Sequence, residues 1–168
     1  MFEGFEIIIR ENLLELLKPK PLATVIALLL LAVIFVAVRK KGLFNTRILT
    51  YGAVSIALSF ILSYVRLVRL PNGGSVTVAS MLPLFIFSYI AGPAAGMAVG
   101  LCYGMLQYIQ EPFFVHWVQF LLDYPIAFAM LGLAGFFKDK PAAGAIVGSI
   151  GRLACHFLSG VVFFAQYA

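Results

Sequence analysis

Residues 115–137 read VHWVQFLLDYPIAFAMLGLAGFF, an apolar run that contains one acid, Asp123. A run of this length can cross the hydrocarbon core of a bilayer as a helix. A carboxylate at membrane depth costs about 2.5–3.5 kcal/mol on insertion scales. We therefore expect Asp123 to meet a positive or hydrogen-bonding group rather than lipid, and the identity of that partner is the main functional question.

The composition of the whole chain is that of an integral membrane protein. The 168 residues are 62% hydrophobic and 11% charged, whereas a soluble domain has about 25% charged residues. The net charge of +5 does not indicate nucleic-acid binding, because the basic residues lie mostly at segment ends, where they set orientation. Cys102 and Cys155 fall in apolar segments without metal-type spacing, which predicts buried free thiols. No metal or cofactor is predicted.

Six hydrophobic segments predict an all-α, polytopic transmembrane helical bundle. They cover residues 21–38, 46–65, 76–90, 94–109, 115–137 and 142–168. Residues 1–20 resemble an amphipathic helix lying on the membrane. Pro-Asn-Gly-Gly at 71–74 predicts a turn, and Gly92-Pro93 predicts a helix break. Dense Gly and Ala at 91–104 and 142–151 predict close helix contacts.

The basic residues predict the orientation of the bundle. Four lie between Arg39 and Arg47 and two between Lys138 and Lys140, and alternating spans place both turns on one side, expected to be cytoplasmic. This topology brings Asp123 and His156 to a similar depth in the outer half of the membrane. We therefore expect one polar pocket that opens to the outside.

The residues around this pocket fit a planar organic cation. Gln119 precedes Asp123 by one helical turn on the same face, and Tyr124 follows it. A carboxylate can pair with a cation, and aromatic faces attract one. The aromatic candidates toward the outer side are His116, Trp117, Phe163, Phe164 and Tyr167.

Structural alternatives remain open for these residues. Asp123 can form a purely structural ion pair with Arg152, and His156 can be a hydrogen-bonded core histidine. Catalysis has weak support, because no Ser or Cys nucleophile stands beside a base and no pair of carboxylates is present. His116, His156 and Asp123 lack a recognisable metal spacing.

Three ordered motifs carry a family resemblance. They are LPNGGSV at 70–76, followed by ASMLP at 79–83; VQFLLDY at 118–124; and HFLSGVVFF at 156–164. Together they resemble the thiamine-specific substrate-binding subunit of energy-coupling factor (ECF) transporters, the ThiT/YuaJ family, over roughly residues 47–168. The resemblance implies a multi-pass protein of the prokaryotic cell membrane that holds thiamine near its outer face under the first loop. It also implies docking on a transmembrane coupling protein and two cytoplasmic ATPases, with no enzymatic activity in this subunit.

The resemblance implies roles for single residues. Asp123 would recognise the aminopyrimidine, with Tyr124 and Gln119 beside it. His156 and Phe164 would pack around the thiazolium, although Phe164 stands where some members carry tryptophan, a stronger cation–π partner. Further pocket residues would be Phe113 and Tyr167, and the coupling protein would contact Ala53 and Ala57.

The resemblance also divides the chain into two parts. Residues 1–42 would be an amphipathic segment plus an extra transmembrane helix, and residues 43–168 the family core. Family members continue into another core helix that supplies a tyrosine and an asparagine, so the expected core is C-terminally truncated and lacks its last helix. The alternatives are a subunit for a thiamine precursor or related vitamin, or a structural membrane protein with the Asp123–Arg152 pair.

Overall fold

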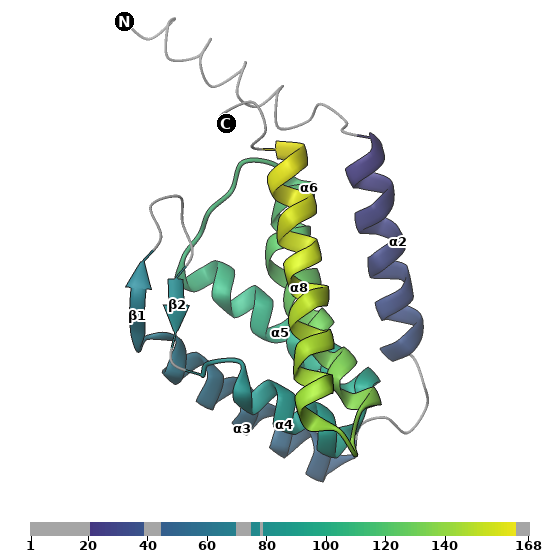
Figure 1. The fold of residues 1–168 in the computed structure, drawn as a ribbon, viewed down its shortest axis with the longest axis vertical. Helices are drawn as coiled ribbons and strands as arrows, with labels where there is room; N and C mark the ends of the chain where they lie inside the picture. The colour runs from purple at the N-terminus through teal and green to yellow at the C-terminus, as the bar shows by residue number, and fades with distance from the viewer. Residues whose placement is uncertain (1–20, 39–44, 70–74, 78, 164–168) are drawn as a thin grey trace, which may run out of the picture.

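The computed structural model describes residues 21–38, 45–69, 75–77 and 79–163, which form a helical bundle with one small hairpin (Figure 1). Its elements are α2 (Pro21–Val38), α3 (Thr46–Ser63), β1 (Arg66–Arg69), β2 (Ser75–Thr77), α4 (Leu82–Ala91), α5 (Pro93–Gln110), α6 (Trp117–Leu121), η1 (Leu122–Ile126), α7 (Ala127–Ala129), η2 (Met130–Phe136) and α8 (Pro141–Phe163). The predicted helical bundle is therefore confirmed. The predicted amphipathic helix at 1–20 lies outside the described residues.

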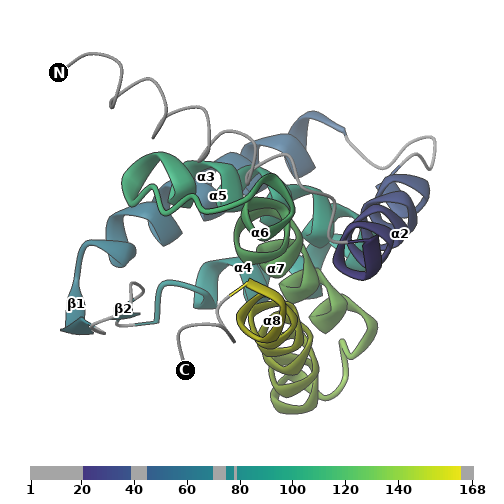
Figure 2. The same ribbon diagram turned by 90° about the horizontal axis from the view of Figure 1, so that it is seen from above.

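Three of the described helical stretches are long and apolar enough to cross a membrane. They are Thr46–Ser63, Trp117–Phe136 and Pro141–Phe163. The middle stretch, which joins α6, η1, α7 and η2, is 67% buried, against 17% and 22% for the others. It is thus the central helix of the bundle, and Figure 2 shows it between α5 and α8.

Proline interrupts the regular winding of this central helix. Leu122–Ile126 form a π-helical turn that contains Asp123 and Pro125. Proline has no backbone N–H to donate, and wide turns of this kind accommodate the missing bond. The helix then tightens into a 3₁₀ stretch at Met130–Phe136. Asp123 therefore sits at a local irregularity rather than in the uniform span expected from the sequence.

The predicted break at Gly92-Pro93 is confirmed. Gly92 ends α4 with a φ of 90°, a conformation that favours glycine, and Pro93 begins α5. The third segment starts later than predicted, at Leu82 instead of Val76. The reason is that Ser75–Thr77 pair with Arg66–Arg69 as an antiparallel hairpin. The predicted turn itself, 71–74, lies outside the described residues.

The expected small-residue contacts form between α5 and the central helix. A Cβ built on Gly100 would lie 2.3 Å from the carbonyl oxygen of Phe128, so a larger residue has no space there. Cys155 is buried as predicted. The same prediction is wrong for Cys102, which is free but exposed, because it lies on the face of α5 away from the central helix.

Candidate functional site

Three hydrogen-bond partners hold the Asp123 carboxylate. Gln119 Nε2 donates to Oδ2 at 2.7 Å and Ser159 Oγ donates to Oδ2 at 2.8 Å. Nδ1 of His156 lies 3.1 Å from Oδ1. The expectation that Asp123 meets hydrogen-bonding groups is confirmed. The Asp123 side chain keeps 17% of its surface exposed and the His156 side chain keeps 38%, so the cluster is not fully enclosed.

The contact between Asp123 and His156 confirms the depth match predicted from the segment lengths. The two residues are 33 positions apart and lie on η1 and α8, which pack against each other. The rise of 1.5 Å per residue along two antiparallel spans was enough to place them at one level. The side of the membrane that this level faces stays a prediction.

Gln119 is fixed from two sides. Its Oε1 accepts the Val115 N–H at 3.1 Å, and its Nε2 donates to Asp123 and lies 3.4 Å from the Phe113 carbonyl oxygen. The side chain is completely buried. Because the Val115 N–H is a donor, Oε1 has to face it, and Nε2 is thereby directed at the carboxylate. Gln119 thus orients Asp123 through a hydrogen bond on the same helix face.

Tyr124 and Phe113 meet each other rather than the carboxylate. The Tyr124 hydroxyl donates to the Glu111 carbonyl at 2.8 Å and accepts the Phe113 N–H at 3.1 Å. The Tyr124 ring packs edge-on against Tyr108. Tyr124 therefore anchors the loop that follows α5, whose Glu111 also pairs with Arg66 of the hairpin. The Phe113 side chain is 43% exposed beside this anchor.

His116 has a structural position at the start of the central helix. It is buried, and its Nδ1 accepts the Val118 N–H as the N-terminal cap of α6. Its ring also contacts Trp117 and Phe163. Among the described residues, no three His, Cys, Asp or Glu side chains lie close enough together to hold a metal ion.

Arg152 reaches the site through His156. Its Nε donates to His156 Nε2 at 3.2 Å, its Nη1 contacts Met81 Sδ at 2.8 Å, and its guanidinium lies 4.3 Å from the centre of the Phe128 ring. Within the described part of the chain, the basic side chain that contacts the Asp123 carboxylate is His156, not Arg152. The alternative of a direct Asp123–Arg152 pair therefore does not describe this structure.

Sequence reasoning missed Ser159 and the role of Arg152 as a neighbour of His156. The available signal was spacing on one helix, since residues 152, 156 and 159 follow each other at intervals of four and three and share a face. Of the other predicted residues, Phe164 and Tyr167 lie outside the described residues. Ala53 and Ala57 lie on the exposed face of α3.

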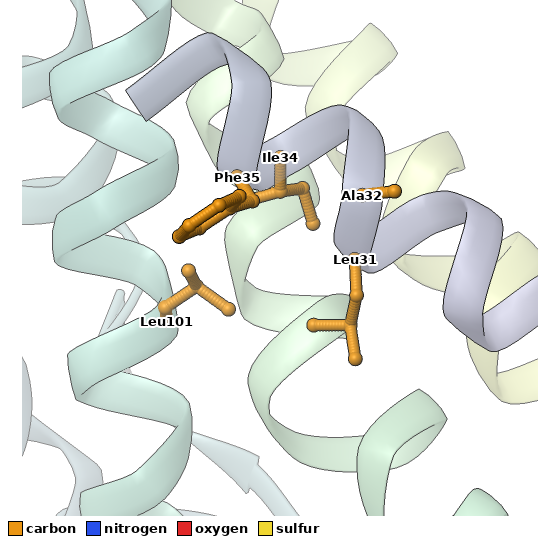
Figure 3. A pocket seen from close by; sticks show the side chains of 5 residues that line it. All are labelled: Leu31, Ala32, Ile34, Phe35 and Leu101. Carbon is orange, nitrogen blue, oxygen red and sulfur yellow. The ribbon is translucent and has the colours of Figure 1, made fainter. Parts of the chain in front are cut away.

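A separate hollow of about 370 Å³ lies between α2 and α5 (Figure 3). Its walls are wholly aliphatic or aromatic, and none of the predicted site residues lines it. Such a surface suits hydrocarbon rather than a polar cation. The lining residues are Leu31, Ala32, Ile34, Phe35 and Leu101.

Comparison with known proteins places this geometry in a family. Residues 49–168 match the thiamine transporter protein family (Thia_YuaJ). The chain belongs to this family. The resemblance predicted from the three motifs is thereby confirmed, and the four residues of the carboxylate cluster all fall within the matched region. As a family member, the chain is a membrane transport protein rather than an enzyme.

Two relatives of the Thia_YuaJ family show how far the likeness extends. ThiT of Bacillus subtilis (strain 168), a thiamine transporter, is 36% identical to this chain. The match covers 69% of this chain and 70% of the relative. A solved structure of ThiT from Listeria monocytogenes shares the fold with a TM-score of 0.63 at 24% identity. That match covers 74% of this chain and 77% of the solved one.

Proposed function

We propose that this chain is the membrane-embedded thiamine-binding subunit of an ATP-driven ECF-type importer. The supporting observation is the Asp123 carboxylate, held by Gln119, His156 and Ser159 inside the region that matches the thiamine transporter family. A carboxylate at membrane depth is costly to insert, and acidic residues in membrane helices generally mark a functional site.

The Asp123 carboxylate has unoccupied lone pairs that suit an aminopyrimidine. A carboxylate has about four lone-pair sites, and three donors occupy part of that capacity. The remaining capacity can accept an N–H of the ligand as a charge-assisted hydrogen bond. The thiazolium cation would then stack against aromatic rings, for which His156 and Phe164 are our proposed partners. Tyr124, Phe113 and Tyr167 complete the proposed lining.

Ligand competition on the purified full-length chain tests the substrate. We expect saturable thiamine binding in isothermal titration, and weak competition by the isolated hydroxymethylpyrimidine, which lacks the cationic ring. Equal affinity for both compounds would indicate that the substrate is a thiamine precursor instead of thiamine. No binding of either compound would contradict the proposed function.

The proposed contact with the coupling protein uses Ala53 and Ala57. Small residues four positions apart on an exposed helix face allow close approach of another helix in lipid. The coupling protein and the two ATPases are the proposed partners, since the chain belongs to a transporter family and transport against a gradient needs an energy source.

We expect Ala57→Leu to reduce thiamine uptake in cells several-fold while binding by the purified subunit stays at the parent level. The larger leucine side chain would hold the helix of the coupling protein away from α3, and it would not reach the carboxylate cluster. Ala154→Leu, an exposed alanine of α8, is the matched control and should support normal uptake. Equal uptake by both variants would remove the α3 face from the proposed interface.

A further inference from the structure

Arg152 is a cation inside a membrane-spanning helix without an acidic partner among the described residues. It belongs to α8, one of the stretches that can cross a membrane. Its guanidinium is stabilised by the face of Phe128 at 4.3 Å and by the sulfur of Met81. A charge at this depth is expensive, and such residues in membrane helices generally serve a function. The Phe128 and Met81 contacts account for the stabilisation of the guanidinium, and the hydrogen bond to His156 is the contact whose role remains to be explained.

The chemistry of the two side chains fixes the proton positions between them. Arginine carries only N–H donors and has no acceptor. For its Nε–H to bond His156 Nε2 at 3.2 Å, that nitrogen must present a lone pair. The proton of the neutral imidazole is then on Nδ1, which lies 3.1 Å from Asp123 Oδ1 and donates to it.

We propose that Arg152 is a positioning residue that fixes the Nδ1–H tautomer of His156 and, through it, the orientation of the Asp123 carboxylate. With Nε2 engaged by Arg152, the imidazole has one remaining in-plane donor, and this donor points at Oδ1. The other tautomer would set two lone pairs, on Nδ1 and Oδ1, against each other. Arg152 thus acts on the Asp123 carboxylate through two successive hydrogen bonds, with His156 between them.

This arrangement also defines what the imidazole offers to a ligand, a point that rests on the proposed function. Both in-plane nitrogens of His156 are occupied, one by Arg152 and one by Asp123. The ring therefore presents only its face, and a π-face suits a flat cation better than an N–H donor would. Specificity for an aromatic cation over a neutral hydrogen-bonding ligand follows.

Nitrogen-15 NMR of the histidine rings tests the tautomer without any ligand. The full-length chain, labelled on histidine and held in nanodiscs at pH 8, has two imidazoles, and comparison with His156→Gln assigns the signals. We expect His156 protonated on Nδ1 only. In Arg152→Met, the expected spectrum is a mixture of both tautomers. In Arg152→Lys, which keeps a cationic donor, the Nδ1–H form should return.

Thiamine affinity of the same variants links the tautomer to binding. We expect at least about a threefold loss in Arg152→Met, the size of one weakened hydrogen bond, and substantial recovery in Arg152→Lys. Arg47→Met, an exposed arginine on α3, is the matched control and should bind normally.

The outcomes separate this inference from the proposed function. An Nε2–H or doubly protonated His156 in the parent protein overturns the inference even if Arg152→Met does not fold. An unchanged His156 spectrum in a folded Arg152→Met also overturns it. If the parent protein shows the Nδ1–H form but does not bind thiamine, the tautomer assignment stands and the proposed function fails.

Discussion

Asp123→Asn should weaken thiamine binding at least about tenfold, which corresponds to about 1.4 kcal/mol. The substitution keeps the shape of the side chain but removes the charge that strengthens its hydrogen bonds. It also replaces one acceptor oxygen with an NH₂ group, which must face at least one of the donors Gln119, His156 or Ser159. Both effects act on the same atoms that would bind the aminopyrimidine.

Isothermal titration of the purified variant measures this loss. Asp139→Asn, the same change in the exposed turn between η2 and α8, is the matched control and should bind like the parent protein. The thermal unfolding midpoint should be recorded for both variants, so that a loss of affinity is separated from a loss of fold. Parent-like affinity in a folded Asp123→Asn would remove the carboxylate from the proposed site.

Gly104→Ala should cause a large loss of stability, because this glycine is the point where α5 approaches the backbone beside Asp123. A Cβ there would lie 2.6 Å from the Tyr124 carbonyl oxygen and 2.9 Å from Pro125 Cα. Both are backbone atoms that cannot rotate away, so α5 and η1 would have to separate. Overpacking of this kind costs about 1–3 kcal/mol, and sometimes more.

Differential scanning calorimetry without ligand checks this expectation. A cost of about 1–3 kcal/mol, at about 2–4 °C per kcal/mol for a chain of this size, should lower the Gly104→Ala midpoint by roughly 2–12 °C. Gly160→Ala is the matched control for stability, since a Cβ at Gly160 would meet nothing within 4 Å among the described residues beyond its own helix backbone. Equal midpoints for the two variants would show that α5 and η1 can move apart without cost.

Local sequence signals predicted most of the helices. The apolar run at 21–38 and the break at Gly92-Pro93 have the bounds expected from composition and proline chemistry. The predicted start of α4 was wrong because Ser75–Thr77 pair with β1. Strand pairing depends on a second segment of the chain and not on local hydrophobicity alone. The π-helical turn at 122–126 was also missed, since Pro125 alone does not indicate which neighbouring turn will widen.

The candidate site could be predicted in part. Counting residues along two spans was sufficient to bring Asp123 near His156. The position of Arg152 was beyond that method, because charge alone paired it with the nearest acid. In the structure, Phe128 and Met81 stabilise the guanidinium and His156 accepts its Nε–H. This environment exists only once α7, α8 and the start of α4 are packed together. Ser159 was missed because helical serines commonly bond their own backbone.

The bond between Gln119 and Asp123 has a consequence for how the protein is made. Both residues lie on the central helix, whereas His156 and Ser159 lie on α8, which the ribosome completes later. The acid therefore enters the bilayer before two of its partners have been synthesised. Gln119 can donate to it as soon as that helix forms, which shields the carboxylate during the interval. The same hydrogen bond that orients the mature site thus eases the insertion of the nascent chain.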